Sequence, residues 1–302
     1  MYLISLVGKQ PMPILIPLWQ FENVTDVQFV ATEETVSHAE NLKQFIQQDK
    51  TLQGIKIHDN IIVEAYNLSE TKTKVSQAIS KNQHHTVLIN YTSGTKIMSL
   101  ACLLASQEYH SKILYVSTET NRLYTYDHAT QSEHCEHIKI NINSFQYFQA
   151  HGFDANYNLN FFRLQPPVKT PKEGDFLEEF AYQECLDSGL FSDVQKNVYI
   201  QKVLPNGKVV KNELDIVMTY NGNLAVCSCK SGRLDNNVLY ELIALSRAEA
   251  MGIYCSRFLI TSSDANDIKP GIKNRAAEYG IKIISKDMHK NLGKIIFSSL
   301  KR

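Results

Sequence analysis

The chain has 302 residues, of which 43% are hydrophobic, and its 31 basic and 31 acidic residues give a net charge of zero. This length and apolar content suffice for two ordinary domains, and the balanced charge argues against a protein that coats DNA nonspecifically, because such binding requires phosphate neutralisation. No run of about eighteen apolar residues and no basic-then-apolar signal sequence is present, which predicts a cytoplasmic protein that does not enter a membrane.

Predicted strands and helices alternate along the N-terminal half. Strands are expected at 2–7, 27–31, 86–90 and 113–116, a β-rich stretch at 55–67, and helices at 13–21, 32–48, from 69 onward, and 96–105. This alternation predicts a mostly parallel, Rossmann-like α/β sheet, in which ligands bind beyond the carboxyl ends of the strands. Strands at 122–126 and 137–142 are expected to complete this half, and a short helix at 145–152 is expected to lead into a connector.

One loop at such a strand end has the composition of a phosphate or ribose site. It combines hydroxyls, a glycine that permits close backbone approach, free N–H groups at a helix start and a lysine. The residues are Thr92, Ser93, Gly94, Thr95 and Lys96. The Walker and dinucleotide glycine spacings are absent. The alternative is an ordinary turn whose threonine caps the next helix.

A proline-rich segment divides the chain. Gln165-Pro166-Pro167, followed by Pro171, is the strongest linker signal, so we assign 1–150 to a first domain, 151–172 to a linker and 173–302 to a second domain. The second domain is predicted to contain helices at 174–188, 236–251 and 266–280. Strands are expected at 198–204, 209–219, 253–261 and 281–284. These elements predict a mixed sheet flanked by helices.

A hairpin in the second domain gathers charged side chains on one face. Asn221-Gly222 is a strong two-residue turn signal. With that turn, Asp215 lies opposite Ser228 and Glu213 lies opposite Lys230, all on one face. Asp215 is suited to hold a divalent ion and Lys230 to orient or activate a water, as phosphodiester hydrolysis requires. The alternative is a solvated face with a cross-strand ion pair.

Basic side chains near the hairpin are available for a local nucleic-acid groove, although such lysines are often only solvated. They are Lys202, Lys208, Lys211, Lys230 and Arg233. The six cysteines stand in apolar contexts and are expected to be buried, reduced thiols rather than disulfides or a zinc site.

Glu178, Asp215 and the Ser228-Cys229-Lys230 run together resemble the PD-(D/E)xK nuclease pattern. Ser228 stands where that family carries an acidic residue. The resemblance implies that Glu241 of the next helix replaces it, so that Glu178, Asp215 and Glu241 bind Mn²⁺ or Mg²⁺ and Lys230 assists catalysis. On the predicted helix, Glu241 falls within an apolar stripe formed by Val238, Leu242 and Leu245. Glu179 is the alternative to Glu178.

Two N-terminal motifs resemble CARF domains, the CRISPR-associated Rossmann folds that sense cyclic oligoadenylates. They are NYTSGTKIMSLA at 90–101 and the opening ISLVGKQPMPILIP. The resemblance implies a homodimer that binds one cyclic tetra-adenylate across its two-fold axis. The implied ligand contacts are Thr92, Ser93, Gly94, Thr95 and Lys96, with Gly8, Lys9, Gln10, Thr32 and Thr35 as weaker candidates.

Together the two resemblances imply a nuclease of type III CRISPR antiviral defence that the cyclic nucleotide activates allosterically. Single-stranded RNA or DNA is the expected substrate, and duplex nicking is a further possibility. Two alternatives remain open. In one, the nuclease-like domain has lost activity with Ser228 and only binds nucleic acid or a partner. In the other, the CARF domain degrades its own ligand.

Overall fold

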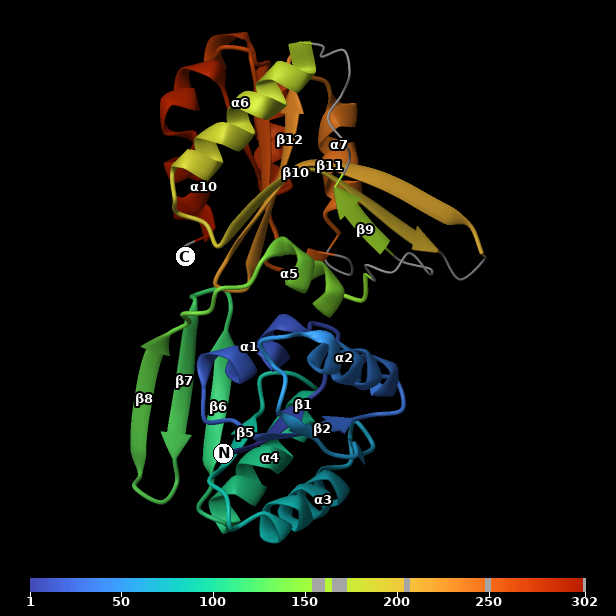
Figure 1. Ribbon diagram of the computed structural model, residues 1–302, viewed down its shortest axis with the longest axis vertical. Helices are drawn as coiled ribbons and strands as arrows, with labels where there is room; N and C mark the ends of the chain where they lie inside the picture. The colour runs from blue at the N-terminus through green and yellow to red at the C-terminus, as the bar shows by residue number, and fades with distance from the viewer. Residues whose placement is uncertain (154–160, 165–172, 204–206, 248–250, 301–302) are drawn as a thin grey trace. The chain divides into compact units, whose positions relative to one another are not determined.

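The computed structural model describes residues 1–153, 161–164, 173–203, 207–247 and 251–300 (Figure 1). The chain forms two compact units, Met1–Ile140 and Asn141–Arg302. The division precedes residue 150 because α5 (Ser144–Ala150) packs on strands of the second unit. Gln165–Pro167 lies outside the described residues, so the linker at 151–172 stays a prediction. Within the described ranges, no helix combines the length and apolar character that crossing a membrane requires.

The first unit is a sheet with helices on both faces, as predicted. The strand order is β3-β2-β1-β5-β6-β7-β8, with β4 also paired to β2. All pairs are parallel except β6–β7 and β7–β8. The strands are β1 (Tyr2–Leu6), β2 (Asp26–Ala31), β3 (Lys56–Ile57), β4 (Ile61–Ile62), β5 (Val87–Asn90), β6 (Lys112–Ser117), β7 (Arg122–Asp127) and β8 (Ser132–His137).

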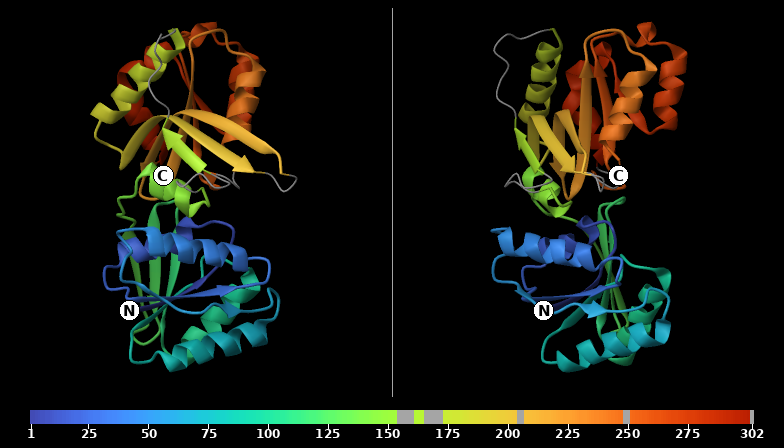
Figure 2. Two further views of the ribbon diagram at one scale, coloured as in Figure 1. Left: turned by 45° about the vertical axis from the view of Figure 1, so that its right-hand side comes forward. Right: turned by 90° about the vertical axis from the view of Figure 1, so that its right-hand side faces the viewer.

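Apolar strands at the centre of this sheet position the loops that follow them. All five residues of β1 are buried, as are the four of β5, which is the pattern of a strand covered on both faces. Figures 1 and 2 show α1 (Met12–Gln20) and α2 (Val36–Gln48) on one face, and α3 (Leu68–Lys81) and α4 (Lys96–Glu108) on the other. Because β2, β1 and β5 are parallel neighbours, their C-terminal loops meet at one edge.

Three expectations for this unit were wrong in detail. The stretch 55–67 forms only the two-residue strands β3 and β4. The strand expected at 137–142 is instead β8, which ends at His137. Ile138, Ile140 and Ile142 alternate in burial as a strand would, but β8 has already paired with β7, and the N–H of Ile138 donates to the carbonyl oxygen of Asn121 beyond the end of that pairing. Cys135 is exposed, whereas the other five cysteines are buried and all six are free.

The second unit is a six-stranded mixed sheet in the order β14-β13-β12-β11-β10-β9. Its strands are β9 (Phe161–Leu164), β10 (Asp193–Val203), β11 (Val209–Tyr220), β12 (Asn223–Lys230), β13 (Ser256–Thr261) and β14 (Ile281–Ile284). The helices α6 (Glu173–Asp187) and α10 (Leu292–Leu300) cover one face, and α7 (Asn236–Leu245) and α9 (Pro270–Glu278) the other (Figures 1 and 2). Short 3-10 turns occur at Ala265–Asp267 and Lys286–Asn291.

The predicted hairpin register is confirmed. Tyr220 pairs with Asn223, and Ile216 pairs with Cys227. Asn221 and Gly222 have φ angles of 48° and 78°, the left-handed conformation that this two-residue turn requires. Counting outward from this ladder, Asp215 and Ser228 face each other. A slip of one residue would have moved them to opposite faces.

Other elements of this unit differ from the expectation. α7 ends at Leu245 rather than Met251, and residues 248–250 lie outside the described part. The helix expected at 266–280 begins only at Pro270, because Pro270 is favoured in a first helical turn. β9, within the predicted linker, and α10 were not predicted. α10 has the apolar repeat of Leu292, Ile296 and Leu300, all buried.

Candidate functional site

Carboxylates from different elements meet at the open end of the β11–β12 hairpin. Glu178 comes from α6, and Glu213 and Asp215 come from β11. Burial and the negative charge of Asp215 raise the pKa of both Glu178 and Glu213. Lys230, the last residue of β12, lies close enough for its positive charge to oppose the rise that burial causes in the pKa of Glu178 and of Asp215. The structure therefore places Glu178, Asp215 and Lys230 within electrostatic range of one another.

Hydrogen bonds fix the carboxylate of Asp215. Its Oδ2 accepts a 2.7 Å hydrogen bond from the backbone N–H of Cys229 and one of 3.2 Å from Ser228 Oγ. The side chain of Asp215 thus connects β11 to β12 where the backbone pairing of the two strands ends. Ser228 acts here as a hydrogen-bond donor that orients Asp215, a role that the acidic residue of the nuclease pattern would not fill.

Burial and mutual repulsion shape the ionisation of the carboxyl groups. Burial raises the pKa of Glu178 to about 7, and the charges of Asp215, Asp175 and Glu213 contribute, while Lys230 opposes the rise. Burial likewise raises the pKa of Asp215, against the hydrogen bond from Cys229 and the charge of Lys230. Asp175 was not predicted, although its position three residues before Glu178 on α6 places it on the same helix face.

Two contacts bear on the alternatives left open by the sequence. Glu179 is exposed and forms an ion pair with Lys196, so it points away from the cluster, whereas Glu178 points into it. Among the described residues, Lys230 has no ion pair with Glu213 within 4.0 Å, so the cross-strand ion pair of the alternative interpretation is not formed.

The expected placement of Glu241 was wrong. The buried face of α7 contains Leu239 and Leu242 and continues at Ser246, one residue later than the predicted stripe. Glu241 is therefore exposed rather than part of an apolar face. It still lies near enough for its charge to raise the pKa of Asp215. Glu241 is thus at the rim of the cluster.

The donor set fits a hard divalent cation in its chemistry. Carboxylate oxygens, one of them oriented by two hydrogen bonds, are the ligands that Mg²⁺ and Mn²⁺ prefer, and a cation would relieve the repulsion among them. No group of three or more His, Cys, Asp or Glu side chains in the described part is close enough to hold a metal ion. The carboxylates are thus near one another without being gathered into a closed cage.

The polar loop of the first unit follows β5, and most of its hydroxyls form hydrogen bonds within the protein that hold the loop in place. Thr92 Oγ1 donates to Asn90 Oδ1 at 2.6 Å and accepts from the N–H of Val116. Thr95 caps α4 by accepting from the N–H of Met98, and donates to the carbonyl oxygen of Ala65 at 2.6 Å. The helix-capping alternative is therefore correct for Thr95. Gly94 has a φ of +80°, which favours glycine.

The first strand contributes a second loop that touches the first. A Cβ atom on Gly8 would lie 3.3 Å from the backbone nitrogen of Gly94 and 3.3 Å from Ser93 Cβ. The two loops are therefore packed backbone to backbone. Gly94 and Lys96 are exposed at this edge, as is Lys9, while Ser93 and Gln10 are half-buried.

Thr32 and Thr35 follow β2 at the same edge of the sheet. Thr35 Oγ1 accepts from the N–H of Thr32 at 2.9 Å and lies 3.2 Å from Thr32 Oγ1. Thr32 is buried. Their hydroxyls thus form a local turn that leads into α2, which supports a structural role for this pair.

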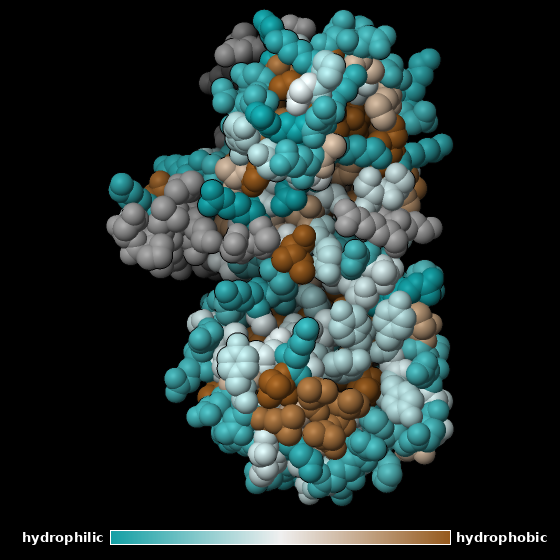
Figure 3. Space-filling model, turned by 180° about the vertical axis from the view of Figure 1, so that it is seen from behind, coloured by the Kyte–Doolittle hydropathy of each residue, from teal (hydrophilic) through white to brown (hydrophobic). Residues whose placement is uncertain are grey.

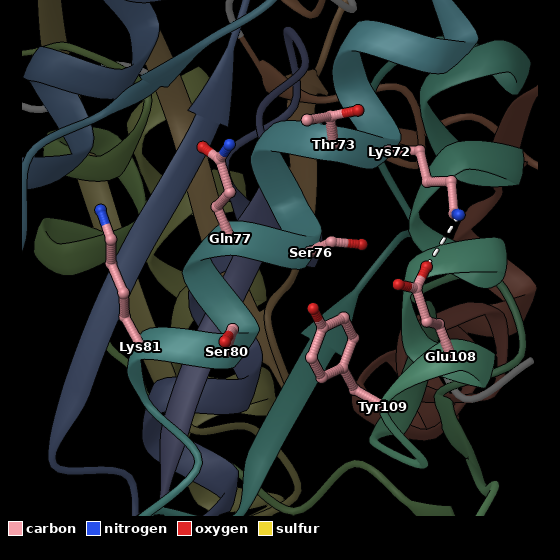
Figure 4. Close-up of a pocket in the computed structure, with 8 residues that line it drawn as sticks. All are labelled: Lys72, Thr73, Ser76, Gln77, Ser80, Lys81, Glu108 and Tyr109. Atoms are coloured by element: carbon pink, nitrogen blue, oxygen red, sulfur yellow. Dashed lines mark ion pairs between the residues drawn. The ribbon is translucent and has the colours of Figure 1, made fainter.

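A separate cavity of about 370 Å³ lies between α3 and α4 (Figure 4). Lys72 Nζ and Glu108 Oε2 form an ion pair of 2.7 Å across it, and both side chains are partly exposed. Gln77 and Lys81 point away from this ion pair. None of the residues predicted for either site lines this cavity, and an ion pair of this exposure contributes at most about 1 kcal/mol to stability.

Comparisons with known families match both halves of the chain. A family model described as "Card1 CARF domain" matches residues 2–145, and one described as "Card1-like, endonuclease domain" matches residues 170–301. The comparison with curated proteins found no match.

Solved structures share the fold at low sequence identity. Protein VC1899 from Vibrio cholerae has a TM-score of 0.78 at 14% identity, over 99% of this chain and 98% of that chain. Can2 from Sulfobacillus thermosulfidooxidans, solved in complex with cyclic tetra-adenylate, has a TM-score of 0.77 at 17% identity, over 100% and 97%. A type III CRISPR defence DNA nuclease activated by cyclic oligoadenylate has 0.57 at 15%, over 87% and 45%.

Proposed function

Because residues 2–145 belong to the Card1 CARF domain family and residues 170–301 to the Card1-like endonuclease domain family, we propose that this chain is a nuclease of type III CRISPR defence activated by a cyclic oligoadenylate. We propose cyclic tetra-adenylate as the activator and single-stranded RNA or DNA as the substrate. The observation that carries the proposal is the meeting of Glu178, Asp215 and Lys230 at the end of the hairpin.

Each side chain at this site has a chemical task in phosphodiester hydrolysis. Glu178 and Asp215 would hold Mn²⁺ or Mg²⁺, and Glu241 at the rim would become a third ligand if the carboxylates drew together around the ion. When bound, the metal ion supplies positive charge to the phosphate and activates a water. Ser228 orients Asp215, and the Lys230 ammonium stabilises negative charge that develops on the phosphate oxygens.

The ligand site is proposed at the edge where the β1 and β5 loops touch. Thr92 and Thr95 maintain the loop through their hydrogen bonds, which leaves Ser93, Gly94 and Lys96 to contact phosphates. The loop after β1 approaches the same place with Gly8, Lys9 and Gln10. The turn after β2, which contains Thr32 and Thr35, supports this edge of the sheet. The start of α4 and the exposed Lys96 and Lys9 at this edge suit the anionic ring of a cyclic nucleotide.

A homodimer of the first unit would place two such loops around one ring. Apolar side chains are exposed along α4, at Leu100, Leu103 and Leu104, and Figure 3 shows brown side chains gathered on this unit. Tyr115 of β6 is also exposed and lies 5.9 Å, centroid to centroid, from Tyr91 in the ligand loop. Exposed apolar side chains on α4, the helix that follows the ligand loop, support ligand binding across the dimer.

We expect Leu100→Asp to convert the protein from a dimer to a monomer, because it buries a charge at the proposed pairing surface. Leu186→Asp is a matched control, since Leu100 and Leu186 are helical leucines with exposed fractions of 49% and 45%. Light scattering should report twice the 34.4 kDa chain mass for the wild type and the control. A wild-type monomer, with or without ligand, would contradict the proposed assembly.

A second function, nucleic-acid binding without cleavage, is favoured by the neutral Ser228 and by the open arrangement of the carboxylates. The two functions give opposite results for two variants. If Glu241 completes the metal site, Glu241→Ala should abolish cleavage that the wild type performs. If the site is inactive, the wild type should cut nothing, and Ser228→Glu should create cleavage.

A further inference from the structure

A cavity of about 510 Å³ in the second unit is lined by three cationic side chains. Arg233 comes from the connection between β12 and α7, and Lys269 and Arg275 come from the start and the interior of α9. Arg233 and Lys269 are exposed and Arg275 is half-buried, and none of the three lies within 4.0 Å of a carboxylate among the described residues. The cavity thus presents positive charge that no described acidic side chain neutralises by direct pairing.

The one acidic residue of the cavity has another task. Asp235 Oδ1 accepts hydrogen bonds from the N–H groups of Asn237 at 2.8 Å and Val238 at 3.2 Å, which caps α7. Its carboxylate is therefore directed to the helix start. Of the basic residues predicted to form a groove, Arg233 lines this cavity. Lys208 and Lys211 are exposed elsewhere, on the β10–β11 hairpin, and the side chain of Lys202 lies outside the described part.

Two exposed tyrosines adjoin the cationic residues. Tyr240 of α7 and Tyr279, after α9, have exposed fractions of 44% and 37%, and their ring centroids are 6.1 Å apart. Arg275 Nη1 donates a 2.9 Å hydrogen bond to Tyr240 Oη, and its guanidinium lies 5.9 Å from the Tyr240 ring centroid. This hydrogen bond holds an arginine of the cavity against an aromatic ring that solvent can reach.

The chain places this surface next to the candidate catalytic residues. Arg233 follows Lys230 by three residues, a span of about 10 Å at most for an extended chain. Tyr240 directly precedes Glu241, whose charge acts on Asp215. α7 and α9 are in contact and lie side by side (Figure 2). A nucleic-acid strand bound at the cavity would therefore lie within a few nucleotides of Glu178 and Asp215.

We infer that Arg233, Lys269, Arg275 and Tyr240 bind single-stranded nucleic acid, with the cations on its phosphates and the Tyr240 ring stacked on a base. This inference rests on the proposed function and deepens it by assigning the residues outside the carboxylate cluster that hold the substrate. Cations alone would fit any nucleic acid backbone. An exposed aromatic ring favours a single strand, because only unpaired bases are free to stack on a side chain.

Binding is tested in the full-length chain that carries Asp215→Asn, so that cleavage does not obscure it. The probes are fluorescent single-stranded DNA and RNA of about 12 nucleotides, a length suited to one such site, and the corresponding duplex, followed by anisotropy. Tyr240→Ala should weaken single-strand binding by about 5-fold to 100-fold, the loss expected for one stacked base, and Tyr240→Phe should retain most of it. Arg233→Ala should weaken binding and make its salt dependence shallower by about one unit of slope.

Lys294→Ala is the charge control, because Lys294 is an exposed lysine on α10 of the same unit. It should bind as the parent does. Parent-like affinity in both Tyr240→Ala and Arg233→Ala would overturn the inference, as would a duplex bound as tightly as the single strand. If the wild type cuts nothing while these variants still lose binding, the binding site stands and the proposed nuclease function fails. If the wild type cuts and the variants bind normally, the proposed nuclease function stands and the proposed binding site fails.

Discussion

Glu178→Gln is expected to abolish ligand-activated cleavage, with a rate loss on the order of 10³-fold, because it removes an anionic ligand from the proposed metal site. Gln has nearly the shape of Glu, so packing at this half-buried position is retained. The change also removes one charge from a group of mutually repelling carboxylates. The folded protein should therefore be as stable as the wild type, or more stable.

The next residue provides the matched control. Glu179 is exposed and pairs with Lys196, so Glu179→Gln removes the same charge from the same helix without reaching the cluster. Cleavage should stay within a few-fold of the wild-type rate, and stability should change by at most about 1 kcal/mol. Single-turnover cleavage and chemical denaturation of both variants separate the two roles. A larger loss of cleavage in Glu179→Gln than in Glu178→Gln would reverse the assignment.

Lys96→Glu is expected to lower affinity for cyclic tetra-adenylate at least about tenfold, because a charge-assisted contact to phosphate is replaced by repulsion. Lys96 is the first residue of α4 and is exposed. A cation at a helix N-terminus opposes the helix dipole by about 0.3–1 kcal/mol. The variant should therefore keep or slightly gain stability while it loses ligand binding and activation.

Lys81→Glu is the reciprocal control. Lys81 is in the last turn of α3, where a cation is favourable. This variant should lose a few tenths of a kcal/mol in stability, the usual size of this effect at an exposed position, and keep full ligand affinity. Calorimetry with the ligand and thermal unfolding together test both. Equal affinity in Lys96→Glu and the wild type would remove Lys96 from the ligand site.

Local sequence signals predicted those parts of the fold and the candidate site that depend on neighbouring residues. Asn221-Gly222 determined the register of the hairpin, and the register placed Asp215 opposite Ser228. The alternation of apolar strands and helices predicted the parallel sheet of the first unit. In both cases a period or a turn, which is visible in a few residues, determines the arrangement.

Features that depend on tertiary packing could not be predicted in the same way. The face of α7 that is buried differs by one residue from the predicted stripe, which moves Glu241 from the interior to the rim. The cavity beside Arg233 joins residues from 233 to 275, and no local pattern links them. Which residues of the ligand loop maintain its structure likewise depends on tertiary contacts. Thr95, for example, donates a hydrogen bond to Ala65, thirty positions away.

The central claim is that a cyclic nucleotide controls a metal-dependent nuclease, and one measurement tests it most directly. It is the cleavage rate of labelled single-stranded RNA and DNA in Mn²⁺, with and without cyclic tetra-adenylate, for the wild type and Asp215→Asn. The account predicts cleavage only when ligand, metal and Asp215 are all present. Cleavage at the same rate without ligand, or tight ligand binding with no cleavage of either strand, would contradict it.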